Sequence, residues 1–130
     1  MSAQKYTLGK SKKLKGKANI ERLFASGRSL FKHPIKLIYG IEPPQSGKTT
    51  FQMGAAVSKK NIRSAVGRNT IKRHLREAVR LQQHELTAER NYKLMFIYVG
   101  PTEVQPTHIH TAIRYLLQQV AHLPQNETDK

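Results

Sequence analysis

The sequence has no cysteine and few acidic residues. Without cysteine, the chain can form no disulfide or thiolate zinc site and has no thiol nucleophile. No apolar run approaches the length of a membrane span. The basic N-terminal stretch is not followed by the apolar segment of a secretory signal. We therefore expect a cytoplasmic protein without a membrane partner.

The shortage of acids leaves a large positive charge. Asp and Glu number 8 against 23 Lys and Arg, so the formal net charge of the 130 residues is +15. The isoelectric point is near 10.4. Such an excess repels itself in a compact fold, and its usual reason is a polyanionic partner.

The length predicts one domain with its own core. Residues 1–13 are polar and rich in lysine, and we interpret them as a flexible basic arm. We expect a single domain over residues 14–123. Residues 124–130 form a polar tail.

The positive charge is concentrated in two blocks. Residues 1–36 hold ten Lys or Arg and one acid, and residues 58–80 hold eight and one acid. A surface optimised for solubility alone mixes both signs. The segregation therefore favours an electrostatic footprint for a polyanion over an ordinary solvated surface.

The first half of the domain predicts a helix and two strands. Ile20, Leu23 and Phe24 have helical spacing, which indicates a short helix over 18–24 that ends near residues 26–27. Residues 35–41 and 51–57 alternate in polarity and predict strands. Pairing across the loop between these two segments would make a hairpin.

The second half predicts a long helix, a buried strand and a last helix. The long helix runs from about Ser64, a plausible N-cap, to Leu86. Residues 92–99 are apolar on both faces and predict a buried central strand. Thr107 can cap the last helix, whose apolar stripe repeats at helical spacing over 109–120. We expect an α+β domain in which helices cover one face of a small sheet.

The long helix has an apolar face beside a cationic one. With Arg68 at 0° and about 100° per residue, the apolar side chains fall between about 280° and 20°, and the cations between about 40° and 140°. The apolar side chains are Ile71, Leu75, Ala78 and Val79. The cationic sector contains Lys72, Arg73, Arg76 and Arg80, and Asn69 lies in the same sector. Stacked like charges destabilise an isolated helix, so a phosphate partner is favoured over incidental charge.

The remaining side chains do not predict a catalytic centre in the protein. Metal-dependent phosphodiester cleavage needs clustered carboxylates, and the eight acids are scattered. His108 and His110 are two residues apart at a helix start and point in different directions. Residues 46–49 lack the first glycine of a phosphate-binding loop. We expect no catalytic residue and no protein-bound metal.

The segments VSKK (57–60) and AVGRNTIKRHLREA (65–78) resemble the signature of the bacterial ribonuclease P protein subunit. Residues 14–24, Gly27 and the segment 37–39 are also similar to that family, so the resemblance covers roughly 13–122. The third arginine of the family's core motif is Thr70 here.

The resemblance implies a fold and a function. The implied fold is a four-stranded sheet packed by three helices in the order α-β-β-β-α-β-α, ribosomal-protein-S5-like, with a left-handed crossover that is an exception to the usual handedness. The implied function is that of a subunit of a tRNA 5′ endoribonuclease, in which the RNA subunit performs the hydrolysis with Mg²⁺. The implied partners are ribonuclease P RNA and precursor tRNA, without DNA.

The resemblance also implies two sets of binding residues. The set expected to bind the RNA subunit is Lys59, Lys60, Arg63, Arg68, Asn69, Lys72, Arg73 and Arg76. The set expected to bind the single-stranded 5′ leader, in a cleft between the sheet and the N-terminal helix, is Lys13, Lys15, Phe24, Leu37 and Tyr39. Aromatic side chains can stack on unpaired bases, and a place in the core is the alternative reading of Phe24.

Two alternatives stay open at this point. One is a ribosomal or chaperone-like RNA-binding protein without a processing role. The other is a nuclease that acts without an RNA subunit.

Overall fold

The computed structural model describes residues 17–42, 50–86, 90–100 and 105–123. Their elements follow the expected order of helix, three strands, helix, strand and helix. The elements are α2 (Lys17–Ser26), β1 (Arg28–Lys32), β2 (Ile35–Glu42), β3 (Thr50–Val57), α3 (Ala65–Gln82), the short 3₁₀ helix η2 (Gln83–Glu85), β4 (Asn91–Tyr98) and α4 (Pro106–Ala121). The predicted arm and polar tail lie outside the described residues.

The four strands form one mixed sheet in the order β1-β2-β4-β3. The predicted hairpin between the second and third strands is wrong, because β4 lies between them. It pairs antiparallel with β2 and parallel with β3. Leu94 and Phe96 of β4 are completely buried on the side of α3 and α4, and Met95 is 6% exposed on the other side. A strand that is apolar on both faces gains most from a central position, and this burial outweighs pairing between neighbours in sequence.

The hairpin of the sheet is instead β1–β2. Lys32 pairs with Ile35 across a tight turn that contains a cis His33–Pro34 peptide bond. The main chain of this turn is tied to the end of β4, because the amide of Val99 donates to the carbonyl of Pro34 at 2.8 Å.

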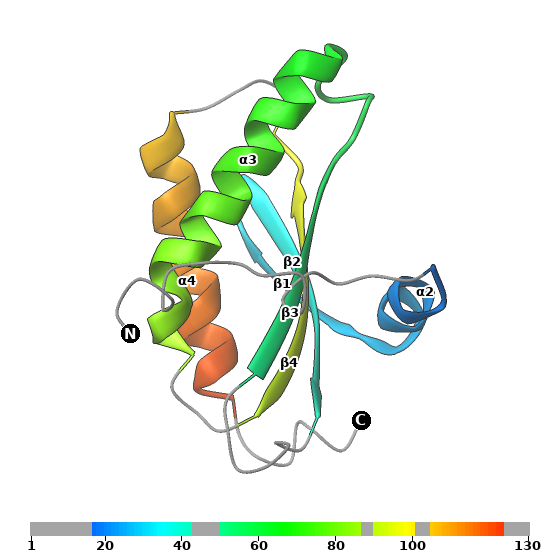
Figure 1. Cartoon of the computed structure of the whole chain (residues 1–130), viewed down its shortest axis with the longest axis vertical. Helices are drawn as coiled ribbons and strands as arrows, with labels where there is room; N and C mark the ends of the chain where they lie inside the picture. Colours follow the sequence, from blue (N-terminus) through cyan, green and yellow to red (C-terminus); the bar gives the residue numbers. More distant parts are fainter. Residues whose placement is uncertain (1–16, 43–49, 87–89, 101–104, 124–130) are drawn as a thin grey trace.

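Helices cover both faces of the sheet, so the expectation that they cover one face is wrong (Figure 1). Helices α3 and α4 lie on one side, where their apolar stripes pack with alternate residues of the strands. Helix α2 lies on the other side, where Leu23 packs against Ile38 of β2 and Met95 of β4. The second layer forms because β4 presents apolar side chains to both sides.

The predicted amphipathic pattern of α3 is confirmed. Ser64 is the N-cap, and its hydroxyl oxygen accepts a hydrogen bond from the amide of Gly67 at 3.1 Å. The four residues assigned to the apolar sector are buried: Ile71, Leu75, Ala78 and Val79. The opposite side of α3 is therefore the side that faces solvent.

The stripe of α4 is also confirmed, but its predicted cap is wrong. Ile109, Ile113 and Leu116 are completely buried. The N-cap is Gln105, in extended backbone, and Pro106 is the first helical residue. Proline suits this position because its fixed φ is helical and an amide there has no partner within the helix. Within the described parts of the chain, no helix has the length and apolarity needed to cross a membrane.

Candidate nucleic-acid interface

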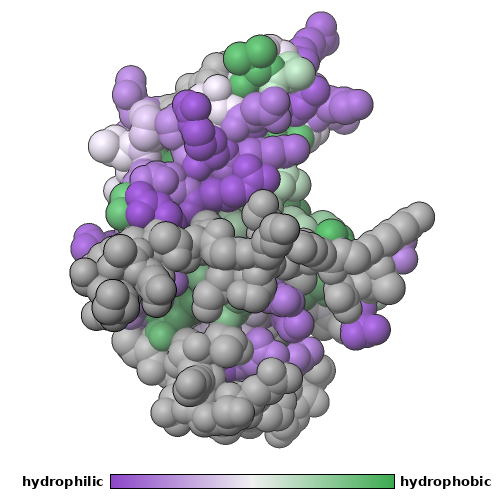
Figure 2. All heavy atoms as spheres, in the orientation of Figure 1, coloured by the Kyte–Doolittle hydropathy of each residue, from purple (hydrophilic) through white to green (hydrophobic). Residues whose placement is uncertain are grey.

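The solvent side of α3 carries a cluster of cations. Arg73 and Arg76 are exposed, and Lys72 is half-buried. Asn69 is also exposed and lies on the same side of the helix, one turn before Lys72 and Arg73. Figure 2 shows hydrophilic side chains gathered over this helix. We call Asn69, Lys72, Arg73 and Arg76 the α3 face.

The cations of the α3 face have no carboxylate partner among the described residues. The only acid within this part of the helix is Glu77, and it pairs with Arg80. The side-chain hydrogen bond from Arg80 is the main cause that lowers the pKa of Glu77. Arg80 therefore balances Glu77, whereas Lys72, Arg73 and Arg76 keep an unbalanced positive charge toward solvent.

The connection between β3 and α3 adds three more exposed cations, which are Lys59, Lys60 and Arg63. Its backbone is ordered by Ser58, whose carbonyl accepts hydrogen bonds from the amides of Asn61 and Ile62 at 3.2 and 3.0 Å. The side chain of Ile62 is buried in the main core. This basic loop, residues 58–64, is thus closed by a turn at Ser58 and held to the core by Ile62, while its three cations are exposed.

Arg68 differs from the other predicted RNA contacts. Its Nη1 donates to the carbonyl oxygens of Ile62 and Arg63 at 2.9 and 2.8 Å. Arg68 thus bonds the basic loop to the first turn of α3. The helical positions contain a signal for this role, because Arg68 at 0° lies within the apolar sector and faces the protein.

Thr70, which stands where the family motif has an arginine, is also bonded within the protein. Its hydroxyl donates to the carbonyl of Val66, four residues earlier, at 3.0 Å. A hydroxyl that bonds to the preceding turn is an ordinary arrangement inside a helix. Nothing in these contacts replaces the charge of an arginine.

The structure does not bring Phe24, Leu37 and Tyr39 together. Phe24 is 49% exposed on α2, but Leu37 and Tyr39 are 0% and 6% exposed in the core that faces α3 and α4. The prediction that Leu37 and Tyr39 line an RNA-binding cleft is therefore wrong. Alternation along β2 turns both away from α2. Lys13 and Lys15 lie outside the described residues.

The residues of β2 that do face α2 are the intervening ones. Lys36 is exposed, and Ile38 packs against Leu23 of the helix. Ala56 of β3 and Ile97 of β4 are half-buried and pack against the same small cluster. We call this side of the sheet, with α2 beside it, the α2-side face. It combines an apolar floor with the exposed cation Lys36.

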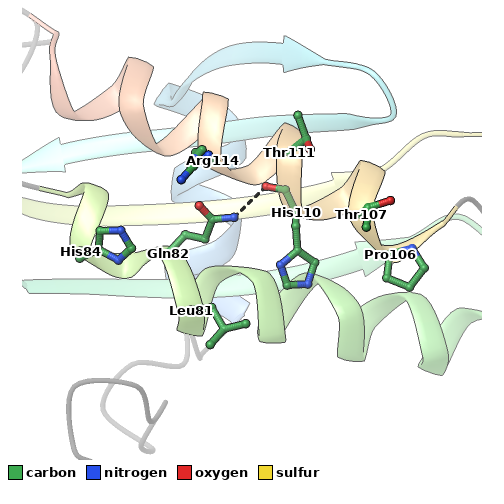
Figure 3. A pocket seen from close by; sticks show the side chains of 8 residues that line it. All are labelled: Leu81, Gln82, His84, Pro106, Thr107, His110, Thr111 and Arg114. Atoms are coloured by element: carbon green, nitrogen blue, oxygen red, sulfur yellow. Dashed lines mark hydrogen bonds between the residues drawn. The ribbon is translucent and has the colours of Figure 1, made fainter. Parts of the chain in front are cut away.

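A cavity of about 590 Å³ lies elsewhere, between the end of α3 and the start of α4 (Figure 3). The histidines that line it, His84 and His110, come from different elements, and Gln82 donates to the carbonyl of His110 at 2.9 Å. The Nε2 atom of His84 lies 3.4 Å from Oε2 of Glu85, and the Nε atom of Arg114 lies 3.7 Å from the same oxygen. Its lining contains no carboxylate.

The described residues hold no cluster of metal-binding side chains. Mg²⁺ prefers oxygen ligands, usually with one or two carboxylates. Among residues 17–42, 50–86, 90–100 and 105–123, no group of three or more His, Asp or Glu could hold a metal ion. The described acids lie apart, and two of them, Glu77 and Glu85, are paired with cations.

The fold and the two sets of cations define a small basic α+β protein suited to a polyanionic ligand. Comparison with known proteins identifies the family. The family model for ribonuclease P matches residues 8–121. The ribonuclease P protein component of Chlorobium phaeobacteroides is 32% identical over 112 residues, which cover 85% of this chain and 72% of that protein.

Other relatives agree with this result. The ribonuclease P protein component of Porphyromonas gingivalis is 33% identical over 81 residues, which cover 62% of this chain and 58% of that protein. The RNase P protein structure from Thermotoga maritima shares the fold, with a TM-score of 0.68 at 18% identity, over 82% of this chain and 96% of that one. The chain belongs to the ribonuclease P protein component family.

Proposed function

We propose that this protein binds the catalytic RNA of ribonuclease P and the single-stranded 5′ leader of precursor tRNA, and so promotes removal of the leader. The observation that carries the proposal is the α3 face, whose exposed cations have no carboxylate partner among the described residues. Arginine presents a planar fork of donors that fits phosphate oxygens in pairs. The face therefore suits an RNA backbone.

The α3 face and the basic loop are assigned to the catalytic RNA. Arg73 and Arg76 donate to phosphates along the exposed side of the helix, with Lys72 at its edge. Lys59, Lys60 and Arg63 continue this surface. Asn69 offers both a donor and an acceptor. Arg68 acts as a positioning residue, since its bonds hold the loop against the helix.

The leader is assigned to the α2-side face instead of the buried Leu37 and Tyr39. Phe24 on α2 and Lys36 on β2 are exposed there. An unpaired strand can place its bases on apolar surface and its phosphates on cations, with weak preference for sequence. The family resemblance adds Lys13 and Lys15 as further leader contacts.

The chemistry is assigned to the RNA subunit. Mg²⁺, which the RNA and the substrate would hold, would supply activation of water and stabilisation of the leaving group. The protein contributes positive charge, which reduces repulsion between the RNA and its substrate. It should therefore tighten binding of the precursor and lower the Mg²⁺ concentration needed for cleavage.

The test is leader removal at low Mg²⁺ with ribonuclease P RNA, precursor tRNA and the protein. We expect the protein to stimulate cleavage, and the Lys72→Gln, Arg73→Gln, Arg76→Gln triple variant to stimulate far less. Arg114→Gln, a single exposed cation on α4, is the control for loss of charge outside the α3 face. No stimulation by the unmodified protein would favour an RNA-binding protein without a processing role. Cleavage without ribonuclease P RNA would favour an independent nuclease.

A further inference from the structure

We propose that Phe31, on the edge strand β1, is a stacking platform for an unpaired base of the leader. The proposal deepens the proposed function and rests on it. Phe31 is 58% exposed, which is the largest exposure of any described phenylalanine. Its ring lies 6.3 Å from that of His33 at an interplanar angle of 57°. The platform is therefore an aromatic pair at the rim of the sheet.

The strand register places Phe31 at one end of a row on the α2-side face. Phe31 pairs with Lys36, Lys36 with Ile97, and Ile97 with Ala56. Directly paired residues project to the same side of a sheet. With strands about 4.8 Å apart, the row from β1 to β3 spans roughly 14 Å. This length suits a few nucleotides laid across the strands.

The β1 end of this row, Phe31 and Lys36, is exposed, whereas Ile97 and Ala56 pack against the cluster that contains Leu23 of α2. Leu23 packs on the adjacent row, where Ile38 and Met95 lie. Ile97 and Ala56 are only partly buried. A lone exposed phenylalanine is common on protein surfaces. Here, however, an aromatic ring, a cation and an apolar floor follow one another in a line.

The groups along the row indicate that its ligand is RNA. It begins at Phe31 and ends at Ala56, three residues before Lys59 of the basic loop. The row thus begins at an aromatic face suited to a base, and the chain that continues beyond its other end carries cations suited to phosphates. A chain of this net charge attracts a polyanion across the row in preference to another copy of itself.

The first experiment uses the absence of tryptophan from the sequence. Phe31→Trp places a single reporter in the holoenzyme assembled with ribonuclease P RNA. We expect precursor tRNA to quench its fluorescence and mature tRNA, which lacks the leader, to leave it unchanged. Tyr115→Trp is the matched control and should respond to neither, because Tyr115 of α4 contacts Lys32 on the opposite side of β1 from Phe31. Quenching by ribonuclease P RNA alone, or equal quenching by both tRNAs, would overturn the proposal.

The second experiment measures affinity. Phe31→Ala should weaken binding of precursor tRNA by the holoenzyme about tenfold, as expected for loss of one base–aromatic stack. Affinity for mature tRNA should not change, and Phe31→Tyr should restore the affinity for the precursor. If Phe31→Ala binds the precursor like the unmodified protein, Phe31 is not the platform. If the unmodified holoenzyme does not distinguish precursor from mature tRNA, the proposed leader function itself fails. A change in oligomeric state on Phe31→Ala would instead assign the row to a second copy of the chain.

Discussion

The α3 face makes a quantitative prediction about salt. Arg73→Gln and Arg76→Gln remove two exposed charges that have no carboxylate partner among the described residues, while each glutamine keeps a long polar side chain. Neither side chain belongs to the core, so the fold should persist. Because each phosphate contact releases counterions, removing two contacts should reduce the dependence of RNA affinity on salt.

The structure gives the size of the effect. Six described cations lie on the α3 face and the basic loop without a carboxylate partner in the described chain: Lys59, Lys60, Arg63, Lys72, Arg73 and Arg76. Six phosphate contacts give a slope of log affinity against log salt of about −5.4, and four give about −3.6. Over a fourfold rise in salt, affinity should then fall by about three decades for the protein and by about two for the double variant.

The assay is binding of ribonuclease P RNA over a salt series at fixed Mg²⁺, with circular dichroism of both proteins to verify folding. Arg114→Gln is the control, because Arg114 approaches Glu85 and lies outside the α3 face. Its slope should equal that of the unmodified protein. An unchanged slope for the double variant would refute the reasoning, since the catalytic RNA would then bind a different surface.

Three further perturbations follow from individual contacts. Ser64→Ala removes the cap of α3 and should lower the free energy of unfolding by about 1 kcal/mol in a urea titration. Arg68→Ala removes both bonds to the basic loop and should speed hydrogen exchange of the Ile62 amide about tenfold, whereas Arg73→Ala should leave that exchange unchanged. Since the pKa of Glu77 is lowered from its ordinary 4.5 by Arg80, its contribution to stability is present above that pH and is lost as pH falls through the lowered pKa. Glu77→Gln should therefore remove part of the acid-induced loss of stability, and an acid titration identical to that of the unmodified protein would contradict this.

Helix α3 was predictable because its signals are local. The cap, the apolar sector and the cationic sector all follow from a period of 3.6 residues within one segment. The structure agrees for Ser64 and for the buried residues of the helix. Arg68 departs, since its position within the apolar sector directs it to the backbone of the preceding loop. The α-helix also ends at Gln82, before the predicted Leu86, and continues as the short 3₁₀ helix η2.

The sheet was less predictable because its order depends on contacts that are distant in sequence. Alternation along 35–41 separates two sets of residues, but it does not show which set faces which helix. Leu37 and Tyr39 were assigned to the wrong layer for this reason, although the strand itself was correct. The position of β4 between β2 and β3 likewise follows from burial of both its faces. Rules that pair strands adjacent in sequence do not predict this position.

The connection from β3 to α3 links the two proposed RNA surfaces. Strand β3 ends beside the α2-side face, and α3 crosses to the opposite side of the sheet. The chain between them is held by Ser58, by the buried Ile62 and by Arg68. A flexible connection would let the leader and the catalytic RNA move independently on the protein. An anchored one fixes the angle between them, so binding energy gained on the α3 face can position the substrate. Loosening this loop by Arg68→Ala should therefore impair leader-dependent cleavage more than it impairs binding of the catalytic RNA.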